Sequence, residues 1–143
     1  MPVPAEYQRA RDDFYAFLVE ARDEADLWST HVTYTMTQGV FQVFRRRMSI
    51  QQAIAFSNVL PVGLRALFVS DWDTDQPIQS FGSLDEMNRE VRELRPQHNF
   101  STESAIQQIS KVLLKHVDRG PLDRVLRDCP RGALEFLYSG KES

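Results

Sequence analysis

Residues 60–68 read LPVGLRALF, and residues 129–138 read CPRGALEFLY. Each stretch has a proline, a glycine two positions later, and then apolar residues at helical spacing. Proline is favoured in the first turn of a helix, where its missing N–H would have no intrahelical partner in any case. Each stretch therefore predicts a short helix that begins at its proline. The two prolines are 69 positions apart, and we align the stretches with one inserted residue in the second.

Further helices are predicted on both sides of these stretches from apolar residues that recur every three or four positions. The expected helices are 6–25, 30–47, 49–59 and 61–70, then 83–94, one from Ser101 or Thr102 to about residue 116, one after Gly120-Pro121, and one from Pro130. Ser49-Ile-Gln-Gln52 and Ser83-Leu-Asp-Glu86 fit capping boxes. The β-branched residues between 30 and 37 are a competing strand signal. Their apolar spacing favours a helix.

The predicted order of elements occurs twice. Ser29-Thr30 and Val40-Phe41 align with Ser101-Thr102 and Val112-Leu113, at an offset of 72. Such self-similarity is typical of duplicated units that bury their apolar faces on each other. We therefore predict an all-α fold, with about eight helices in two similar halves (about 6–72 and 83–140) that share one core in a single domain, 1–143. The residues expected in this core are Leu64, Leu67, Phe68, Leu134, Leu137 and Tyr138.

Composition narrows the class of protein. The 143 residues are 42% hydrophobic and 26% charged, as in ordinary globular domains. The net charge of −3 argues against nucleic-acid binding, which usually needs a basic face. The single Cys129 forms no intrachain disulfide. No signal peptide or membrane span is evident, so we expect a cytoplasmic protein without membrane attachment.

A family resemblance rests on three features of the first half and the start of the second. They are Leu60-Pro61-x-x-Leu64-Arg65-x-Leu67, then Trp72-Asp73, then an acidic helix that begins at Leu84-Asp85-Glu86. In these features the chain resembles a family of small bacterial proteins known as domain of unknown function number twenty-two sixty-seven. The resemblance covers about residues 14–138 and implies a bacterial origin and a helical fold of one or two such units. It implies no functional residues. The second unit departs from the pattern, because Cys129 stands before its proline and no tryptophan follows its last helix.

Two charged motifs are candidate sites. Asp71-x-Asp73-x-Asp75 resembles the start of a calcium loop, but Gln76 and Gly82 stand where that loop needs a glycine and a carboxylate. We therefore predict no metal site. Arg45-Arg46-Arg47 is the one basic run, at the predicted end of a helix, where cations complement the helix dipole. It is a candidate contact for an anion or a protein partner, and the alternative is a purely structural role.

The histidines and the cysteine show no spacing that is typical of a metal site or a catalytic site. His31, His98 and His116 have no metal-ligand spacing, and His116 is interpreted as a satisfied histidine at the edge of the core. Cys129 is interpreted as a small buried residue. No phosphate loop, nucleophile motif or redox motif is present. We therefore expect no enzymatic activity and no cofactor.

The functional prediction is a protein-interaction or regulatory module that acts through a helical surface, with another protein or as a homodimer. The alternative is a small-ligand-binding protein with a pocket between the halves. Aromatic residues such as Trp28, Tyr34, Phe41 and Phe56 would line that pocket, unless they belong to the core.

Overall fold

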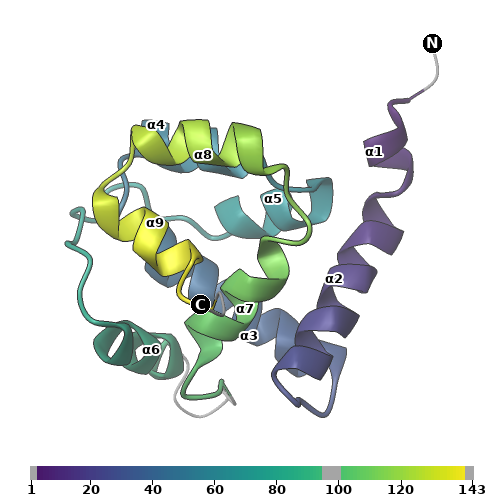
Figure 1. Cartoon of the computed structure of the whole chain (residues 1–143), viewed down its shortest axis with the longest axis horizontal. Coiled ribbons are helices and arrows are strands. Elements are labelled where there is room, and N and C mark those ends of the chain that lie inside the picture. The colour runs from purple at the N-terminus through teal and green to yellow at the C-terminus, as the bar shows by residue number, and fades with distance from the viewer. Residues whose placement is uncertain (1–2, 95–100, 141–143) are drawn as a thin grey trace.

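The computed structural model describes residues 3–94 and 101–140. Over these ranges the chain is all-helical and contains no strand (Figure 1). The helices are α1 (Ala5–Gln8), α2 (Ala10–Glu24), α3 (Thr30–Arg45), α4 (Ile50–Ser57), α5 (Val62–Val69), α6 (Leu84–Glu93), α7 (Ala105–Leu113), α8 (Arg119–Arg127) and α9 (Arg131–Leu137). None of these helices combines the length and the apolar character that a membrane crossing requires.

Helix boundaries differ from the predictions at a few positions. The first predicted helix breaks at Arg9, which has a φ of −96° and a ψ of 5°. The helix expected from Ser101 or Thr102 begins at Ala105, and it ends at Leu113, before His116. Pro121 is the third residue of α8, still in the first turn, where its missing N–H breaks no helical bond. Pro61 and Pro130 directly precede α5 and α9 in nearly the same backbone conformation.

Helix ends are stabilised partly as the sequence predicts. The box at α4 is complete, because Ser49 and Gln52 each accept a backbone N–H from the other. At α6 only the serine half is present: Ser83 accepts from Glu86 N. Helix α7 has no cap from its own preceding residue. The buried Asn88 of α6 supplies it instead, since its Oδ1 accepts from Ile106 N at 2.9 Å.

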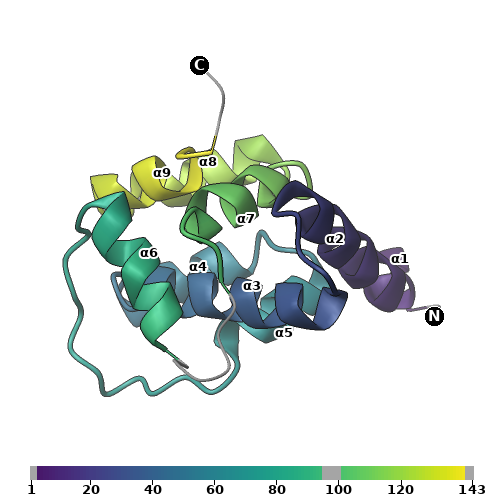
Figure 2. The ribbon, with the colours of Figure 1, turned by 90° about the horizontal axis from the view of Figure 1, so that it is seen from below.

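Helix α3 lies in the middle of the molecule, with α7 and α5 on opposite sides and α6 and α2 at its two ends (Figure 2). Its threonines fit a buried helix because their hydroxyls bond within it: Thr37 Oγ1 donates to the carbonyl of Thr33 at 2.8 Å. Rings from both predicted halves meet at Phe44, whose centroid lies 4.9 Å from that of Phe56 and 4.8 Å from that of Phe136.

Several contacts between helices recur when α2 to α5 are compared with α6 to α9. Both α3 and α4 pack on α5. In the same way, α7 and α8, later in the chain, pack on α9. Other contacts join the first four of these helices to the last four: α3 packs on α6, α2 packs on α7, and α4 packs on α8. Gln52 Nε2 joins the last pair by donating to the carbonyl of Asp128 at 2.8 Å. The duplication and the limits of its halves stay predictions.

Candidate functional site

The basic run lies at the end of α3, and its first member, Arg45, is almost fully buried. Its Nη1 donates to the carbonyls of Phe68 and Ser70 at 2.8 and 2.7 Å, and its Nη2 donates to that of Asp71 at 2.9 Å. The guanidinium also lies 5.4 Å from the centroid of the Trp72 ring. Burial lowers the pKa of Arg45, with a smaller effect from Arg46, but a guanidinium keeps its charge in proteins. Arg45 therefore caps the end of α5 and holds the tryptophan that follows it.

The next two arginines share one carboxylate of α6. Arg46 Nη1 and Arg47 Nη2 donate to the two oxygens of Glu90 at 2.8 and 2.7 Å. Arg47 also donates from Nε to the carbonyl of Ser80 at 3.1 Å. Burial raises the pKa of Glu90, but the hydrogen bonds from both arginines outweigh it, so the net pKa lies below the ordinary value. These contacts join α3 to the connection 71–82 and to α6.

Arg45, Arg46 and Arg47 all make hydrogen bonds within the chain. Arg45 and Arg47 use their donors on carbonyls and on Glu90. Arg46 is more exposed and lines a surface hollow. A contact with an anion or a partner stays a prediction, and Arg46 is the member that a partner could reach.

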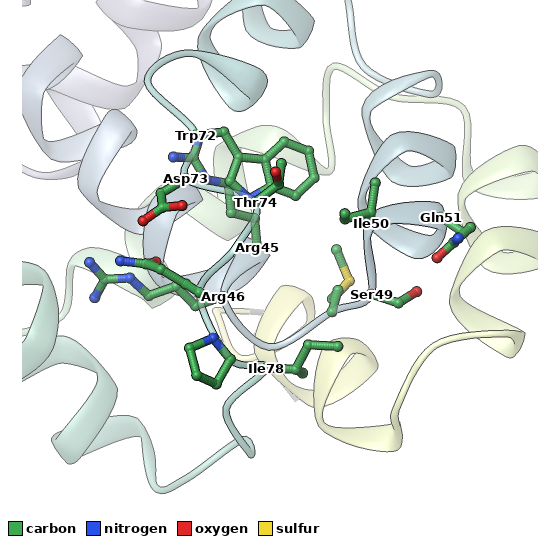
Figure 3. A pocket seen from close by; sticks show the side chains of 12 residues that line it. Arg45, Arg46, Ser49, Ile50, Gln51, Trp72, Asp73, Thr74 and Ile78 are labelled. Atoms are coloured by element: carbon green, nitrogen blue, oxygen red, sulfur yellow. The ribbon is translucent and has the colours of Figure 1, made fainter.

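This hollow has a volume of about 370 Å³ and lies between the start of α4 and the connection 71–82. We name it the Trp72 hollow. Trp72 and Ile50 stand on facing sides of it, and Ile78 lies at its edge (Figure 3). Ile50 is 42% exposed and Ile78 63%, and Ile54, one helical turn beyond Ile50, is 47% exposed. The hollow therefore has an aromatic wall and an apolar rim.

One carboxylate, that of Asp73, lines the hollow, and two more aspartates lie beside it on the connection. Asp71, Asp73 and Asp75 are exposed on the connection, and Asp73 Oδ1 accepts from Asp75 N at 3.0 Å. Asp71 has a φ of 50°, in the left-handed region that aspartate tolerates better than most residues. Among the described residues, no three histidine, cysteine or acidic side chains are grouped to hold a metal ion. The absence of a calcium site stays a prediction.

A second hollow, of about 580 Å³, lies between α8 and α9. This α8–α9 groove is lined by Asp123, Leu126, Arg127, Leu134, Glu135 and Tyr138. Tyr138 is held in place by a hydrogen bond from its hydroxyl to Asp123 Oδ1 at 2.9 Å and by the guanidinium of Arg119, 5.4 Å from its ring centroid. Burial, and next the bond to Asp123, raise the pKa of Tyr138.

The groove corrects one prediction about the core. Leu64, Leu67, Phe68 and Leu137 are buried as predicted, but Leu134 is 44% exposed and Tyr138 only half-buried. The buried face of α9 consists of Ala133, Phe136 and Leu137, and Leu134 is one residue, about 100°, away from Ala133 around the helix. The inserted residue in the sequence alignment caused the error. Without it, Leu64 aligns with the buried Ala133, and Leu134 corresponds to the only partly buried Arg65.

The remaining candidates have structural surroundings. His116 Nε2 lies 2.7 Å from Glu20 Oε2, and its ring stands edge-on to Phe17, which confirms a satisfied histidine at the core's edge. Cys129 is half-buried rather than buried, and burial raises the pKa of its thiol, with a further contribution from Asp128. His31 stacks on Tyr34, and His98 lies outside the described residues.

The aromatic residues considered for a ligand pocket do not gather around one. Phe41 and Phe56 are buried in the core, and Trp28 is 73% exposed beside α3. A third hollow, of about 450 Å³, does lie between the predicted halves. Its lining combines apolar side chains with charged ones, among them Arg9, Asp13, Arg65 and Asp118.

A family model described as an uncharacterized conserved protein, DUF2267, matches residues 14–136. The chain belongs to this family. The match confirms the resemblance seen in the leucine-proline step and the tryptophan that follows it. No curated protein matches the chain significantly. The DUF2267 assignment therefore names no activity, and any function must be argued from the geometry.

Proposed function

We propose that this DUF2267 chain is a protein-interaction module, and that its Trp72 hollow receives a large apolar side chain of a partner flanked by lysine or arginine. One observation carries the proposal: the exposed Ile50 and Ile78 stand at a hollow that has Trp72 in its wall. Covering one such side chain fully is worth about 1.5–3 kcal/mol. Partner residues that dominate binding are typically those that fill a pocket of this kind.

The charge around the hollow supports a basic partner. The connection carries three exposed aspartates, at 71, 73 and 75, whereas Arg46 at the hollow is already paired with Glu90. Complementary charge at the rim of an interface speeds association and selects among partners. A partner segment with lysine or arginine beside its apolar anchor would meet these aspartates.

The wall of the hollow is held in position before any partner binds. The carbonyls of Ser70 and Asp71, just before Trp72, accept from Arg45, and Gln79 N, just after Ile78, donates to the carbonyl of Arg46 at 3.0 Å. A surface that is already ordered loses less conformational entropy on binding. We also propose that the module works in the cytoplasm without catalysis and without nucleic acid, in keeping with its net charge of −3.

The second candidate function is binding of a small charged ligand in the 450 Å³ hollow between the predicted halves. It is favoured by the charged residues of both signs at that hollow, including Arg9, Arg65 and Asp13. A metabolite that raises the melting temperature of the wild type, but not that of Arg9→Gln, would support it.

A random-peptide display library tests the first proposal. We expect enriched peptides to carry a large apolar residue beside lysine or arginine, and to bind more weakly as salt concentration rises. In fluorescence anisotropy, Ile78→Ser should weaken binding at least about ten-fold. Leu134→Ser, which removes an exposed leucine outside this hollow, should leave binding unchanged. Equal binding to the wild type and to Ile78→Ser would overturn the proposal.

A further inference from the structure

Leu134 at the α8–α9 groove is apolar, whereas the residue at the corresponding position of α5 is charged. Leu134 is 44% exposed on α9, and the residue 69 positions earlier, on α5, is Arg65. In the groove, Leu126 is buried and Tyr138 is held by Asp123 and Arg119. The groove is therefore an ordered apolar depression with a protruding leucine at its side.

The corresponding face of α5 is covered by the chain itself. Phe14 of α2 packs so closely on Gly63 that a Cβ atom there would lie 2.8 Å from Phe14 Cβ. Arg65 Nη1 donates to the hydroxyl of Tyr7 in α1 at 3.5 Å, and its Nη2 lies 3.9 Å from Glu6. On α9, Phe81 covers Gly132 in the same way, but Leu134 stays exposed.

The charges beside Leu134 are self-complementary. Arg131 precedes Leu134 by three residues, and Glu135 directly follows it. Within one chain the two side chains form an ion pair, with Arg131 Nε 3.5 Å from Glu135 Oε1, and they stay 92% and 69% exposed, so a second copy can reach both. When two copies of a helix approach each other antiparallel, the residues before the centre of one face those after the centre of the other. Arg131 of each copy would then face Glu135 of its partner. A two-fold interface requires a patch that complements itself in this way.

We propose that the α8–α9 groove is the interface of a homodimer, in which Leu134 of each copy enters the groove of the other and Arg131 pairs with Glu135 across the two-fold axis. This interface is separate from the Trp72 hollow and goes beyond the proposed function. A leucine side chain fits within a hollow of about 580 Å³. Burying Leu134 against Leu126 and Tyr138 supplies the attraction, and the paired charges set the antiparallel orientation.

Sedimentation equilibrium between about 1 μM and 1 mM tests the dimer, because this range of concentrations covers the Kd values of weak complexes. The wild type should dimerise reversibly, and Leu134→Ser should weaken dimerisation at least about ten-fold. Arg131→Glu and Glu135→Arg should each weaken it similarly, because like charges then face each other. Both positions are exposed, so an unchanged circular-dichroism spectrum and melting temperature would show that each variant folds.

Mixing the two charge variants provides the decisive measurement. In a mixed dimer, the two glutamates of Arg131→Glu face the two arginines of Glu135→Arg, so we expect equimolar mixtures to regain wild-type association. Ile78→Ser, at the Trp72 hollow, should dimerise like the wild type. A monomeric wild type over the whole range, an unaffected Leu134→Ser dimer, or no gain on mixing would each overturn the proposal.

Discussion

The ring of Phe81 lies over Gly132 so closely that a Cβ atom at position 132 would overlap the ring's Cγ. Phe81 belongs to the connection 71–82 and Gly132 to α9. The ring cannot move away freely, because it also packs on Phe44 and Phe136, with centroids 6.0 and 6.2 Å away. This glycine therefore lets the connection between the predicted halves dock on the last helix.

Replacing Gly132 with alanine should destabilise the fold by about 1–3 kcal/mol, because the added methyl group overpacks the contact with Phe81. The better helix propensity of alanine, up to about 1 kcal/mol, should not offset this. Urea denaturation measures the change. Gly120→Ala in α8 is the matched control: its Cβ would meet only Arg124 Nη1, at 3.8 Å, so stability should be unchanged or higher. A Gly132→Ala protein as stable as the wild type would contradict the close contact.

Helix α9 carries one buried leucine, Leu137, and one exposed leucine, Leu134. Leu137→Ala should cost about 2–5 kcal/mol because Leu137 is buried, and Leu67→Ala in α5 should cost a similar amount. Leu134→Ala, at low protein concentration, should change stability by less than about 0.5 kcal/mol. Calorimetry should show one transition that both core variants lower, since the predicted halves share one core. Two transitions, each sensitive to one leucine, would indicate independent halves.

Arg45→Lys tests the tie between α3 and the Trp72 hollow. A lysine ammonium cannot reach the carbonyls of Phe68, Ser70 and Asp71 together, so we expect a loss of more than about 2 kcal/mol from unpaired buried acceptors. The fluorescence of Trp72, isolated in a Trp28→Phe background, should shift to the red as the ring becomes more exposed. Arg46→Lys keeps a cation beside Glu90 and should cost less. Equal effects of the two changes would mean that charge alone matters at position 45.

Glu90 should make stability depend on pH in the acid range. The pKa of Glu90 in the folded protein lies below the ordinary value of 4.5. The ion pairs of Glu90 with Arg46 and Arg47 therefore stabilise the fold above pH 4.5, and this contribution is lost as the pH falls through the folded pKa. Near neutral pH, Glu90→Gln should cost about 1.5–3 kcal/mol from weakened charged hydrogen bonds. Urea denaturation over a series of pH values should show this difference shrinking in acid. Glu93→Gln, exposed on the same helix, is the control, and a difference that persists at low pH would contradict the assignment.

Much of the local structure could be predicted from the sequence. The complete capping box at Ser49 and Gln52 and the burial of Leu67, Phe68 and Leu137 follow from patterns within a few residues. Helix spacing and caps are local properties, so a single chain displays them. The start of α7 was misplaced because its cap comes from Asn88, 18 residues before Ile106.

The sequence by itself determined the helical class, most helix positions, the family and the lack of any known reactive motif. Only the tertiary structure decided what Arg45, Arg46 and Arg47 do, because their partners outside α3 lie 23 to 44 residues away, at the end of α5, on the connection and on α6. It also decided that Leu134 faces outward while Leu137, three residues later, is buried. Both residues are leucines on one short helix, and their exposure depends on which side of α9 meets α7 and α8. Periodicity shows that a helix has an apolar side, but the packing of distant helices selects which apolar residues are covered.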